Sequence, residues 1–564
     1  MRIRDWLDLR TGYRALGKAA FGEPVRGGAS WAYVFGSALA LMFVQQIATG
    51  VLLALFYSPA TTTAWGSIHY IEHDVLLGWF VRGLHHYGSS AMVILVVLHM
   101  FQAFAFRAYA APREVNWWTG LVLFGVVLGF SVTGYLLPWD QKGFWATRVV
   151  TSIAGAFPWI GTWLKTTLQG GNDLGNLTLT RFFGFHVFIL PALLGGFLVA
   201  HVAVFRRHGV TVRADRAAAD VEARTEPFWP RQLTFDVAFF AAIVAILVAT
   251  TIARHGAPLD APADPSSGYP ARPEWYFLWL FELLKVVPGS LEGVAMLGLV
   301  GAIAAFLALL PLVDRQSTRT AQSRWPHFAV AGGIAATALT LTIIPIVEDA
   351  QDPGLAAQLD SFDRDAERAF ALAEKGVPPG GAGDLYLNDP LERGKRLFAA
   401  ECQVCHRFGA KGGDTAPDLT GYMTASWIRS VTADPTQPRY FGRTPVAGMP
   451  VSDATPAELD KLTAYEMSLG GRAPEPAGGG DLFEELGCQT CHARAGDKPR
   501  LGPSLTGYGS RAWIVGALKN PGSPAYYGDQ NTMPAFAGKL TDAQLDDLVT
   551  YVLSGGEPTT EKSP

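Results

Sequence analysis

The sequence predicts an all-α protein in which a bundle of seven transmembrane helices is followed by two small α-helical domains. Three observations lead to this fold class. Long apolar runs alternate with short polar links up to about residue 346. The basic residues of this region gather in alternate links. Beyond residue 346 the chain is rich in Gly, Pro, Asp and Glu, and a pattern of cysteines and aromatic residues occurs there twice.

Seven apolar runs are long enough to cross a bilayer, because a helix needs about 20 residues to span ~30 Å of hydrocarbon. They cover residues 31–56, 79–106, 117–138, 182–205, 234–253, 291–312 and 326–346. We divide them into a four-helix part, residues 31–232, and a three-helix part, residues 233–346. Residues 347–390 are predicted to be the linker to the two small domains.

The N-terminal segment 1–30 is basic, aromatic and amphipathic without the continuous apolar core of a signal peptide, so we expect it on the inner membrane face. Arg and Lys also crowd the links after the second, fourth and sixth runs, which the positive-inside rule makes cytoplasmic. An odd number of crossings then places the chain after residue 346 outside the cytoplasmic membrane of a bacterium. The net charge of −4 argues against a nucleic-acid partner.

Two of the apolar runs each contain a pair of histidines separated by nearly a whole number of helical turns. His85 and His99 lie in the second run, and His186 and His201 lie in the fourth. Both separations are close to four turns, so each pair shares one helix face, about 21 Å apart along the axis. Both helices run inward, which sets His85 level with His186 and His99 level with His201. A single such histidine is usually a packing or proton-relay residue. Two level pairs favour two non-covalent b-type haems, because imidazole is a ligand for iron.

Four glycines repeat at the same helical interval in the other two runs. Gly36 and Gly50 lie in the first run, and Gly120 and Gly134 lie in the third. Glycine lets a flat macrocycle approach the backbone closely, although small residues also serve plain helix packing. We therefore expect the four glycines to pack against the two haems.

All four cysteines fall in two Cys-x-x-Cys-His motifs, residues 402–406 and 488–492. This motif attaches a c-type haem through two thioethers and supplies a histidine ligand. A disulfide would leave the adjacent histidines unexplained, and structural zinc would need both pairs in one site. Each motif is followed by a Met-Pro pair in a Gly- and Pro-rich loop, and equal placement in both repeats favours His/Met ligation over a packing methionine. The predicted haem sites are Cys402, Cys405, His406 and Met449, and Cys488, Cys491, His492 and Met533.

The two repeats, residues 391–472 and 473–564, resemble small mono-haem cytochrome c domains. Each begins before its Cys-x-x-Cys-His motif and ends in a helical pattern, "PAELDKLTAYEMSL" or "TDAQLDDLVTYVLS". The predicted covalent cofactors are therefore two c-type haems.

Residues 1–346 resemble cytochrome b of the cytochrome bc complexes. The resemblance rests on Arg82-x-x-His85, the four histidines, the four glycines, "GYLLPWDQ" at 134–141 and "PEWY" at 273–276. The interval between His186 and His201, Asp140 and the seven crossings place it nearer the chloroplast-type bf branch, with that branch's two chains fused. In that branch an extra haem is bound covalently at the position of Val34, so here no covalent haem is expected there.

The resemblance implies a subunit of a quinol:cytochrome c oxidoreductase. Glu274 of "PEWY" would accept a proton at an outer quinol-oxidation site, because oxidising a quinol releases two protons. Tyr276, Tyr135 and Pro138 would wall this site, and Lys142 is expected to be an interfacial polar residue. Arg206 and Asp236 are candidates for an inner quinone site, although cytoplasmic basic residues usually only set topology.

The resemblance also implies partners and an electron path. One electron would reach the c haems through a Rieske iron–sulfur protein, which must be a separate subunit because the haem motifs use every cysteine. The other would cross the membrane through the two b haems to quinone, contributing to a proton gradient. The complex is expected to be a homodimer that passes electrons to a soluble or membrane-bound cytochrome or oxidase.

Two other functions are compatible with parts of this pattern. A non-catalytic haem-b and haem-c conduit that anchors a periplasmic dehydrogenase could carry paired histidines, but it has no need of "PEWY" or "GYLLPWDQ". A transporter or channel with regulatory haem domains would need intramembrane charges facing a pore, and the apolar runs contain almost none.

Overall fold

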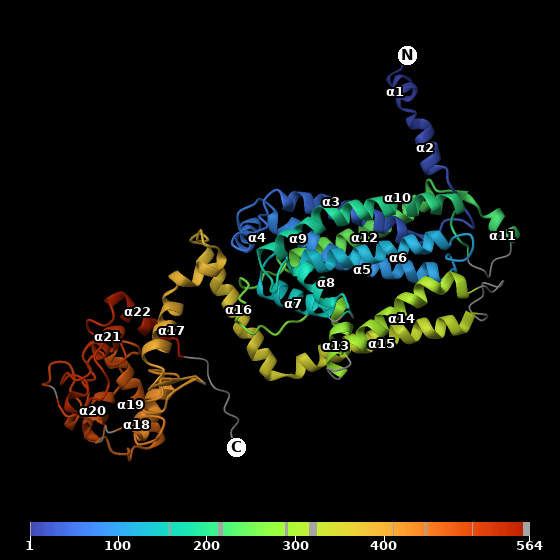
Figure 1. Ribbon diagram of the computed structural model, residues 1–564. Helices are drawn as coiled ribbons and strands as arrows, with labels where there is room; N and C mark the ends of the chain where they lie inside the picture. Colours follow the sequence, from blue (N-terminus) through green and yellow to red (C-terminus); the bar gives the residue numbers. More distant parts are fainter. Residues whose placement is uncertain are drawn as a thin grey trace. The chain divides into compact units, whose positions relative to one another are not determined.

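The structure, a computed structural model, describes residues 2–155, 157, 159–212, 218–287, 292–314, 324–409, 411–444, 446, 448–498 and 500–555. The start of the sixth apolar run and the basic link that follows it lie partly outside these residues. The chain forms two compact units, Met1–Gly383 and Asp384–Pro564, coloured from blue to yellow and from orange to red in Figure 1. The all-α fold class is confirmed, because the described strands are each only a residue pair.

The first unit is built around long apolar helices (Figure 1). After α1 (Ile3–Thr11) and α2 (Tyr13–Phe21) come α3 (Val34–Ala54), α5 (Gly78–Ala105), α6 (Glu114–Tyr135), α10 (Leu190–His208), α12 (Arg231–Ala253), α14 (Glu292–Val313) and α15 (Trp325–Gln351). A π-helical turn, η2 (Phe185–Ile189), joins α9 (Asn176–Gly184) to α10. Within the described residues, six helices are long and apolar enough to cross a membrane, and α14 contributes the shorter apolar stretch Gly298–Val313. Six of the seven predicted spans are thus confirmed.

These helices are apolar all round, as lipid-exposed helices must be. In α3 only Val34, Ala38, Met42 and Thr49 are buried, while large apolar side chains such as Val44 and Val51 are exposed. The buried faces of α3, α5, α6, α10 and α12 meet in one hydrophobic core. The outward apolar surface would contact lipid, so this unit is an integral membrane domain.

Short elements close the two ends of the bundle. At one end β1 (Pro24–Val25) pairs antiparallel with β2 (Glu226–Pro227). At the other end lie α4 (Ala64–His73), α7 (Gln141–Gly155) and α8 (Gly161–Gln169). The amphipathic segment "GFWATRVVTSI" forms most of α7, whose buried face includes Phe144 and Thr147.

The helices α14 and α15 attach to this bundle through a buried polar cluster. The guanidinium of Arg324 donates to Asp314 Oδ2 at 3.0 Å and to the Tyr109 hydroxyl at 2.6 Å, and all three side chains are buried. Arg107 donates to the backbone carbonyl of Asp314 at 2.6 Å. The cluster therefore fastens the end of α14 and the start of α15 to the link between α5 and α6.

The predicted linker contains a helix, α16 (Pro353–Ala373). Asp352 caps it by accepting hydrogen bonds from the backbone N–H groups of Gly354 and Leu355, and Pro353 occupies the first helical position. Phe370 of α16 stacks on Trp65 of α4, with ring centroids 5.8 Å apart. The helix thus packs on the membrane unit.

The second unit contains the two repeats. Its helices are α17 (Pro390–Glu401), α18 (Ala425–Ala433), α19 (Pro456–Leu469), α20 (Gly479–Glu485), α21 (Arg511–Lys519) and α22 (Asp542–Leu553). The short strands β3 (Arg407–Phe408) and β4 (Lys411–Gly412) pair after the first motif. The last helix of each repeat begins with a capping box, at Thr455 with Glu458 and at Thr541 with Gln544.

Candidate functional site

The four membrane histidines form two pairs at the levels expected from their spacing. The imidazoles of His85 in α5 and His186 in η2 have centroids 6.2 Å apart. Those of His99 in α5 and His201 in α10 are 6.4 Å apart. All four rings lie inside the bundle, where two helices face each other with a histidine from each.

Each of the four glycines faces one of these imidazoles. A Cβ atom on Gly50 would lie 3.1 Å from His85 Cε1, and one on Gly134 would lie 2.6 Å from His186 Cε1. A Cβ atom on Gly36 would lie 3.3 Å from His99 Cε1, and one on Gly120 would lie 3.3 Å from His201 Cε1. Such contacts are closer than a Cβ atom normally makes, so glycine at these positions leaves room for the imidazole rings.

Three threonines, each directly before one of these glycines, hold the histidines. Thr49 Oγ1 lies 2.9 Å from His85 Nδ1, Thr119 Oγ1 lies 3.0 Å from His201 Nδ1, and Thr133 Oγ1 lies 3.1 Å from His186 Nδ1. Each hydroxyl donates its only hydrogen to a carbonyl of its own helix, so its oxygen is left to accept from Nδ1–H. Nε2 then keeps its lone pair for a metal.

These threonines were not among the predicted site residues. The sequence does contain a pattern that could have indicated them, because a Thr-Gly pair occurs at residues 49–50, 119–120 and 133–134. The fourth glycine follows Phe35 instead, so the histidine that faces it, His99, lacks this threonine.

The predicted outer site brings together segments far apart in the sequence. The carboxylate of Glu274 forms an ion pair with Lys142 at 3.2 Å, and its side chain is 18% exposed. Lys142 Nζ also lies 5.5 Å from the ring centroid of Tyr135. Tyr276 packs against the hydrophobic core of the bundle, and Pro138, between Tyr135 and Lys142 in sequence, is half-buried. Lys142, expected to be only an interfacial polar residue, is thus a neighbour of two predicted site residues.

Backbone hydrogen bonds join the "GYLLPWDQ" turn to the segment before "PEWY". The N–H of Gln141 donates to the carbonyl of Ala261 at 2.9 Å, and the N–H of Ala263 donates to that of Trp139 at 3.1 Å. The two motifs therefore belong to one structure at one end of the bundle.

This junction buries a pair of carboxyl groups. The N–H of Asp260 donates to Asp140 Oδ2 at 3.3 Å, and the Tyr269 hydroxyl donates to Asp260 Oδ2 at 2.8 Å. Burial, followed by the charge of Asp260, raises the pKa of Asp140 to about 6. Burial also raises the pKa of Asp260. The pair therefore keeps a proton to a higher pH than exposed carboxyl groups would.

Both Cys-x-x-Cys-His histidines are oriented in the same way. His406 Nδ1 lies 2.7 Å from the carbonyl oxygen of Pro417, and His492 Nδ1 lies 2.9 Å from that of Pro503. A carbonyl can only accept, so Nδ1 carries the hydrogen and Nε2 is free to bind a metal. The side chain of Met449 is 40% exposed, whereas Met533 packs against a hydrophobic cluster.

Family models match both units of the chain. "Cytochrome b/b6/petB" matches residues 21–209, and "Cytochrome b(C-terminal)/b6/petD" matches residues 262–358. "Cytochrome c" matches residues 391–470, and "Cytochrome C oxidase, cbb3-type, subunit III" matches residues 474–552. Cytochrome b of Rhodobacter capsulatus is 33% identical over 354 residues, which cover 58% of this chain and 80% of that protein.

The chain belongs to the cytochrome b family. The chain is 40% identical over 218 residues to the menaquinol:cytochrome c reductase cytochrome b subunit of Bacillus subtilis, covering 37% of this chain and 97% of that one. Cytochrome b6 of Prochlorococcus marinus is 35% identical over 209 residues, covering 37% of this chain and 96% of that protein. A solved structure titled "Hyperthermophilic respiratory Complex III" has a TM-score of 0.54 and 27% identity, covering 66% of this chain and 97% of that chain.

The cytochrome b and cytochrome c domains imply haem b and haem c, and the histidine pairs fit a haem between them. Metal–imidazole bonds of about 2.0–2.1 Å and ring bonds of ~1.35 Å place the ring centres of two axial imidazoles about 6.3 Å apart. The observed separations are 6.2 Å and 6.4 Å. The separation of the ring centroids in each pair therefore suits two imidazoles that share one metal ion.

The two candidate residues for the inner quinone site have partners within the chain. Arg206 forms an ion pair with Glu23 at 2.7 Å, and Asp236 accepts a hydrogen bond from Gln232 at 2.8 Å. Asp236 is 1% exposed. Both side chains have a role in local structure, which is the plainer explanation of their presence.

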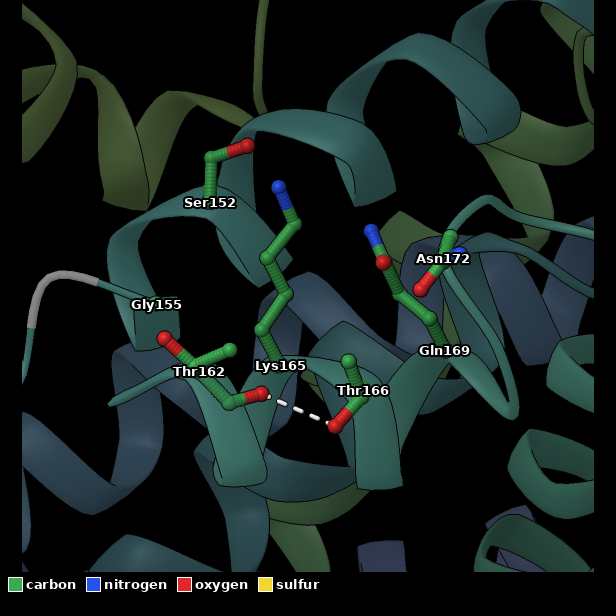
Figure 2. Close-up of a pocket in the computed structure, with 7 residues that line it drawn as sticks. All are labelled: Ser152, Gly155, Thr162, Lys165, Thr166, Gln169 and Asn172. Carbon is green, nitrogen blue, oxygen red and sulfur yellow. Dashed lines mark hydrogen bonds between the residues drawn. The ribbon is translucent and has the colours of Figure 1, made fainter. Parts of the chain in front are cut away.

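A pocket of about 520 Å³ lies between α7 and α8 (Figure 2). It is lined by Ser152, Gly155, Thr162, Lys165, Thr166, Gln169 and Asn172. All the lining residues except Gly155 have polar side chains, and none of them is a predicted site residue. It therefore differs from the mostly apolar pocket that a quinone ring requires.

Proposed function

We propose that this chain is the fused cytochrome b and cytochrome c subunit of a bc-type quinol:cytochrome c oxidoreductase. The observation that carries the proposal is the pair of stacked histidine sites, with separations that suit two axial imidazoles. The cytochrome c domains after the membrane unit supply a route to an external acceptor. The likeness to a menaquinol:cytochrome c reductase subunit supports the same reaction class.

Two haem b and two haem c would be bound. His85 with His186 would hold the outer haem b, and His99 with His201 the inner one. Cys402, Cys405 and His406 would hold one haem c, and Cys488, Cys491 and His492 the other. The four haems would supply one-electron carriers at fixed positions. The threonine and proline oxygens would keep the ligating Nε2 atoms deprotonated for every haem histidine except His99.

Glu274 would accept a proton from quinol in the outer site, beside Tyr276, Tyr135 and Pro138. The ammonium of Lys142 lies 3.2 Å from the Glu274 carboxylate and would hold the proton acceptor in position. After Glu274 is protonated, the Asp140–Asp260 pair would be the candidate for the next proton acceptor, because Asp260 also interacts with Lys142. Arg206 and Asp236 stay as candidates for the inner quinone site.

The bundle would span the cytoplasmic membrane of a bacterium seven times, with α14 as the remaining crossing. The N-terminus would then be cytoplasmic, and the outer site and the c domains would face outward. A separate Rieske protein would carry one electron from quinol to a c haem, a soluble or membrane-bound cytochrome or oxidase would accept it, and the complex would be a homodimer. These assignments rest on the basic links and on the family resemblance.

The test is quinol-dependent reduction of an external c-type acceptor by the purified complex. Glu274→Gln removes the proton acceptor, and we expect acceptor reduction to fall at least tenfold, toward the range of general-base effects of about 10²–10⁴. Glu348→Gln is the matched control, because Glu348 is 57% exposed and pairs with Lys285 rather than with Lys142. Full activity of Glu274→Gln would contradict the catalytic function and favour the non-catalytic conduit.

A further inference from the structure

The first helix of repeat 1 packs on the last helix of repeat 2. Arg393 of α17 forms a two-pronged ion pair with Asp547 of α22, with N–O distances of 2.7 and 2.8 Å. Gly394 allows the closest approach, because a Cβ atom there would lie 2.8 Å from Tyr551 Cβ and would overlap the carbonyl of Asp547. The crossing thus joins residues 154 positions apart in the chain.

Residues of repeat 2 also complete the surroundings of the first Cys-x-x-Cys-His motif. The ring of Tyr551 lies 5.6 Å from that of Phe398 and 4.8 Å from that of Phe408, on the two sides of the motif in sequence. Cys402 and Met533 pack against the same hydrophobic cluster, which includes Phe398, Phe536 and Leu548. Met533 therefore shares a hydrophobic cluster with Cys402 of the first motif, whereas Cys488 of the second motif packs against another cluster.

At the second motif, the last helix of repeat 1 packs on the first helix of repeat 2 in a corresponding way. Tyr465 in α19 takes the place in repeat 1 that Tyr551 takes in repeat 2, and its ring is 5.6 Å from that of Phe483 in α20. A Cβ atom on Gly479 would lie 3.0 Å from Tyr465 Cδ2. Cys488 and Ala454, which closely follows Met449 in sequence, pack against one cluster around Leu462 and Leu482.

The charges on the facing side chains also favour the packing of α17 on α22 of the other repeat rather than on α19 of its own repeat. The counterpart of Asp547 in α19 is Lys461, at the same position of the other repeat. If α17 packed on α19 within its own repeat, Arg393 would face Lys461, a like charge. In the exchanged arrangement it meets Asp547, an opposite charge.

We propose that each c-haem site is completed by the other repeat, so that His406 is paired with Met533 and His492 with Met449. The proposal rests on the c-haem function proposed above, and it differs from the pairing of each histidine with the next methionine in the chain. Neither repeat is then an independent domain, because each supplies the closing helix and the sixth ligand of the other.

The experiment uses the full chain with only one c-haem attached. Cys402→Ala with Cys405→Ala leaves the haem at Cys488 and Cys491. In this background we expect Met449→Ala to abolish the ferric methionine–iron charge-transfer band and to lower the midpoint potential, since thioether ligation raises it. Met533→Ala should leave both unchanged. Loss of the band in Met533→Ala but not in Met449→Ala would overturn the proposed pairing of His492 with Met449.

Two further measurements guard against misfolding of the single-haem chain. The reciprocal background, Cys488→Ala with Cys491→Ala, should show the effect with Met533→Ala and not with Met449→Ala. Met467→Ala is the control in both backgrounds, because Met467 lies within α19 and outside the Met-Pro loops. If neither motif attaches haem in the unmodified chain, the proposed c-haem function itself fails, which is distinguishable from a reversed methionine pairing.

A double-mutant cycle on the two-haem chain tests the helix exchange without removing haem. Arg393→Ala and Asp547→Ala should have non-additive effects on the thermal stability of the c-haem unit, because each removes the partner of the other. Additive effects would contradict contact between α17 and α22.

Discussion

The ammonium of Lys142 lies 3.2 Å from the carboxylate of Glu274, although the two residues are 132 positions apart. Lys142 follows the "GYLLPWDQ" turn, and Glu274 lies in "PEWY". The hydrogen bonds between that turn and residues 261–263 bring the two side chains together. Lys142 is therefore placed to orient the side chain of the proposed proton acceptor.

Replacing Lys142 by methionine should slow quinol oxidation. The ion pair at 3.2 Å holds the Glu274 carboxylate in one place, so the proposed proton acceptor would be less well positioned without it. We expect the rate of quinol oxidation to fall by up to about 10²-fold, as for a small misplacement of a reacting group. Lys165→Met on α8 is the control. An unchanged rate would show that the ion pair does not position the acceptor.

Replacing Gly134 by alanine should eliminate the outer haem b. The added Cβ would lie 2.6 Å from His186 Cε1 inside a packed helix pair, so the imidazole would be forced out of its position. The matched control is Gly125→Ala in the same helix, where the Cβ would meet no described atom within 4 Å. Redox difference spectra should show one b-type signal for Gly134→Ala and two for Gly125→Ala. Two unperturbed signals in both variants would refute the role of this glycine.

Replacing Thr49 by valine should weaken haem binding at His85 and raise the potential of that haem. The threonine oxygen accepts from Nδ1–H at 2.9 Å, and this hydrogen bond makes the ring a stronger electron donor. Loss of such a partner typically costs about 10–100-fold in metal affinity. Thr342→Val is the control, since Thr342 donates to the carbonyl of Ala338 in its own helix. Haem titration of the apo-form and redox potentiometry are the measurements, and equal values for both variants would contradict the prediction.

Glu466 in the second unit should make stability depend on pH. Burial raises the pKa of Glu466 to about 7, although the hydrogen bond that Thr432 donates at 2.9 Å acts in the opposite direction. Because the folded state binds this proton more tightly than the unfolded state, the stabilisation is complete below the ordinary pKa of 4.5 and is lost as the pH rises to about 7.

In the Glu466→Gln variant this side chain is neutral at every pH. The variant should therefore not lose stability as the pH rises to about 7. We expect the c-haem unit of the variant to melt at a higher temperature than the unmodified chain at pH 8, by about 2–4 °C for each kcal/mol regained. The two should differ less at pH 5. Glu485→Gln, at an exposed glutamate, is the control. A larger gain at pH 5 than at pH 8 would contradict the assigned direction.

The sequence by itself determined the membrane helices, the levels of the four histidines and the two haem-attachment motifs. These features depend on local periodicity, because the interval between the histidines of one helix is close to a whole number of turns in any helix. Length and hydropathy likewise fix which segments can cross a bilayer. The helix α16 within the predicted linker was not predicted, because its alanine-rich pattern follows a proline and an acidic stretch that suggest a loop.

Only the tertiary structure decided which distant residues meet. No local pattern links Lys142 to Glu274, Asp140 to Asp260, or α17 to α22, since each contact depends on how whole helices are packed. Chain order suggested that each c-type motif takes the next methionine, whereas packing favours the methionine of the other repeat. Two helices pack where the shapes and charges of their surfaces match. The close approach of Gly394 to Asp547 therefore cannot be predicted from either helix alone.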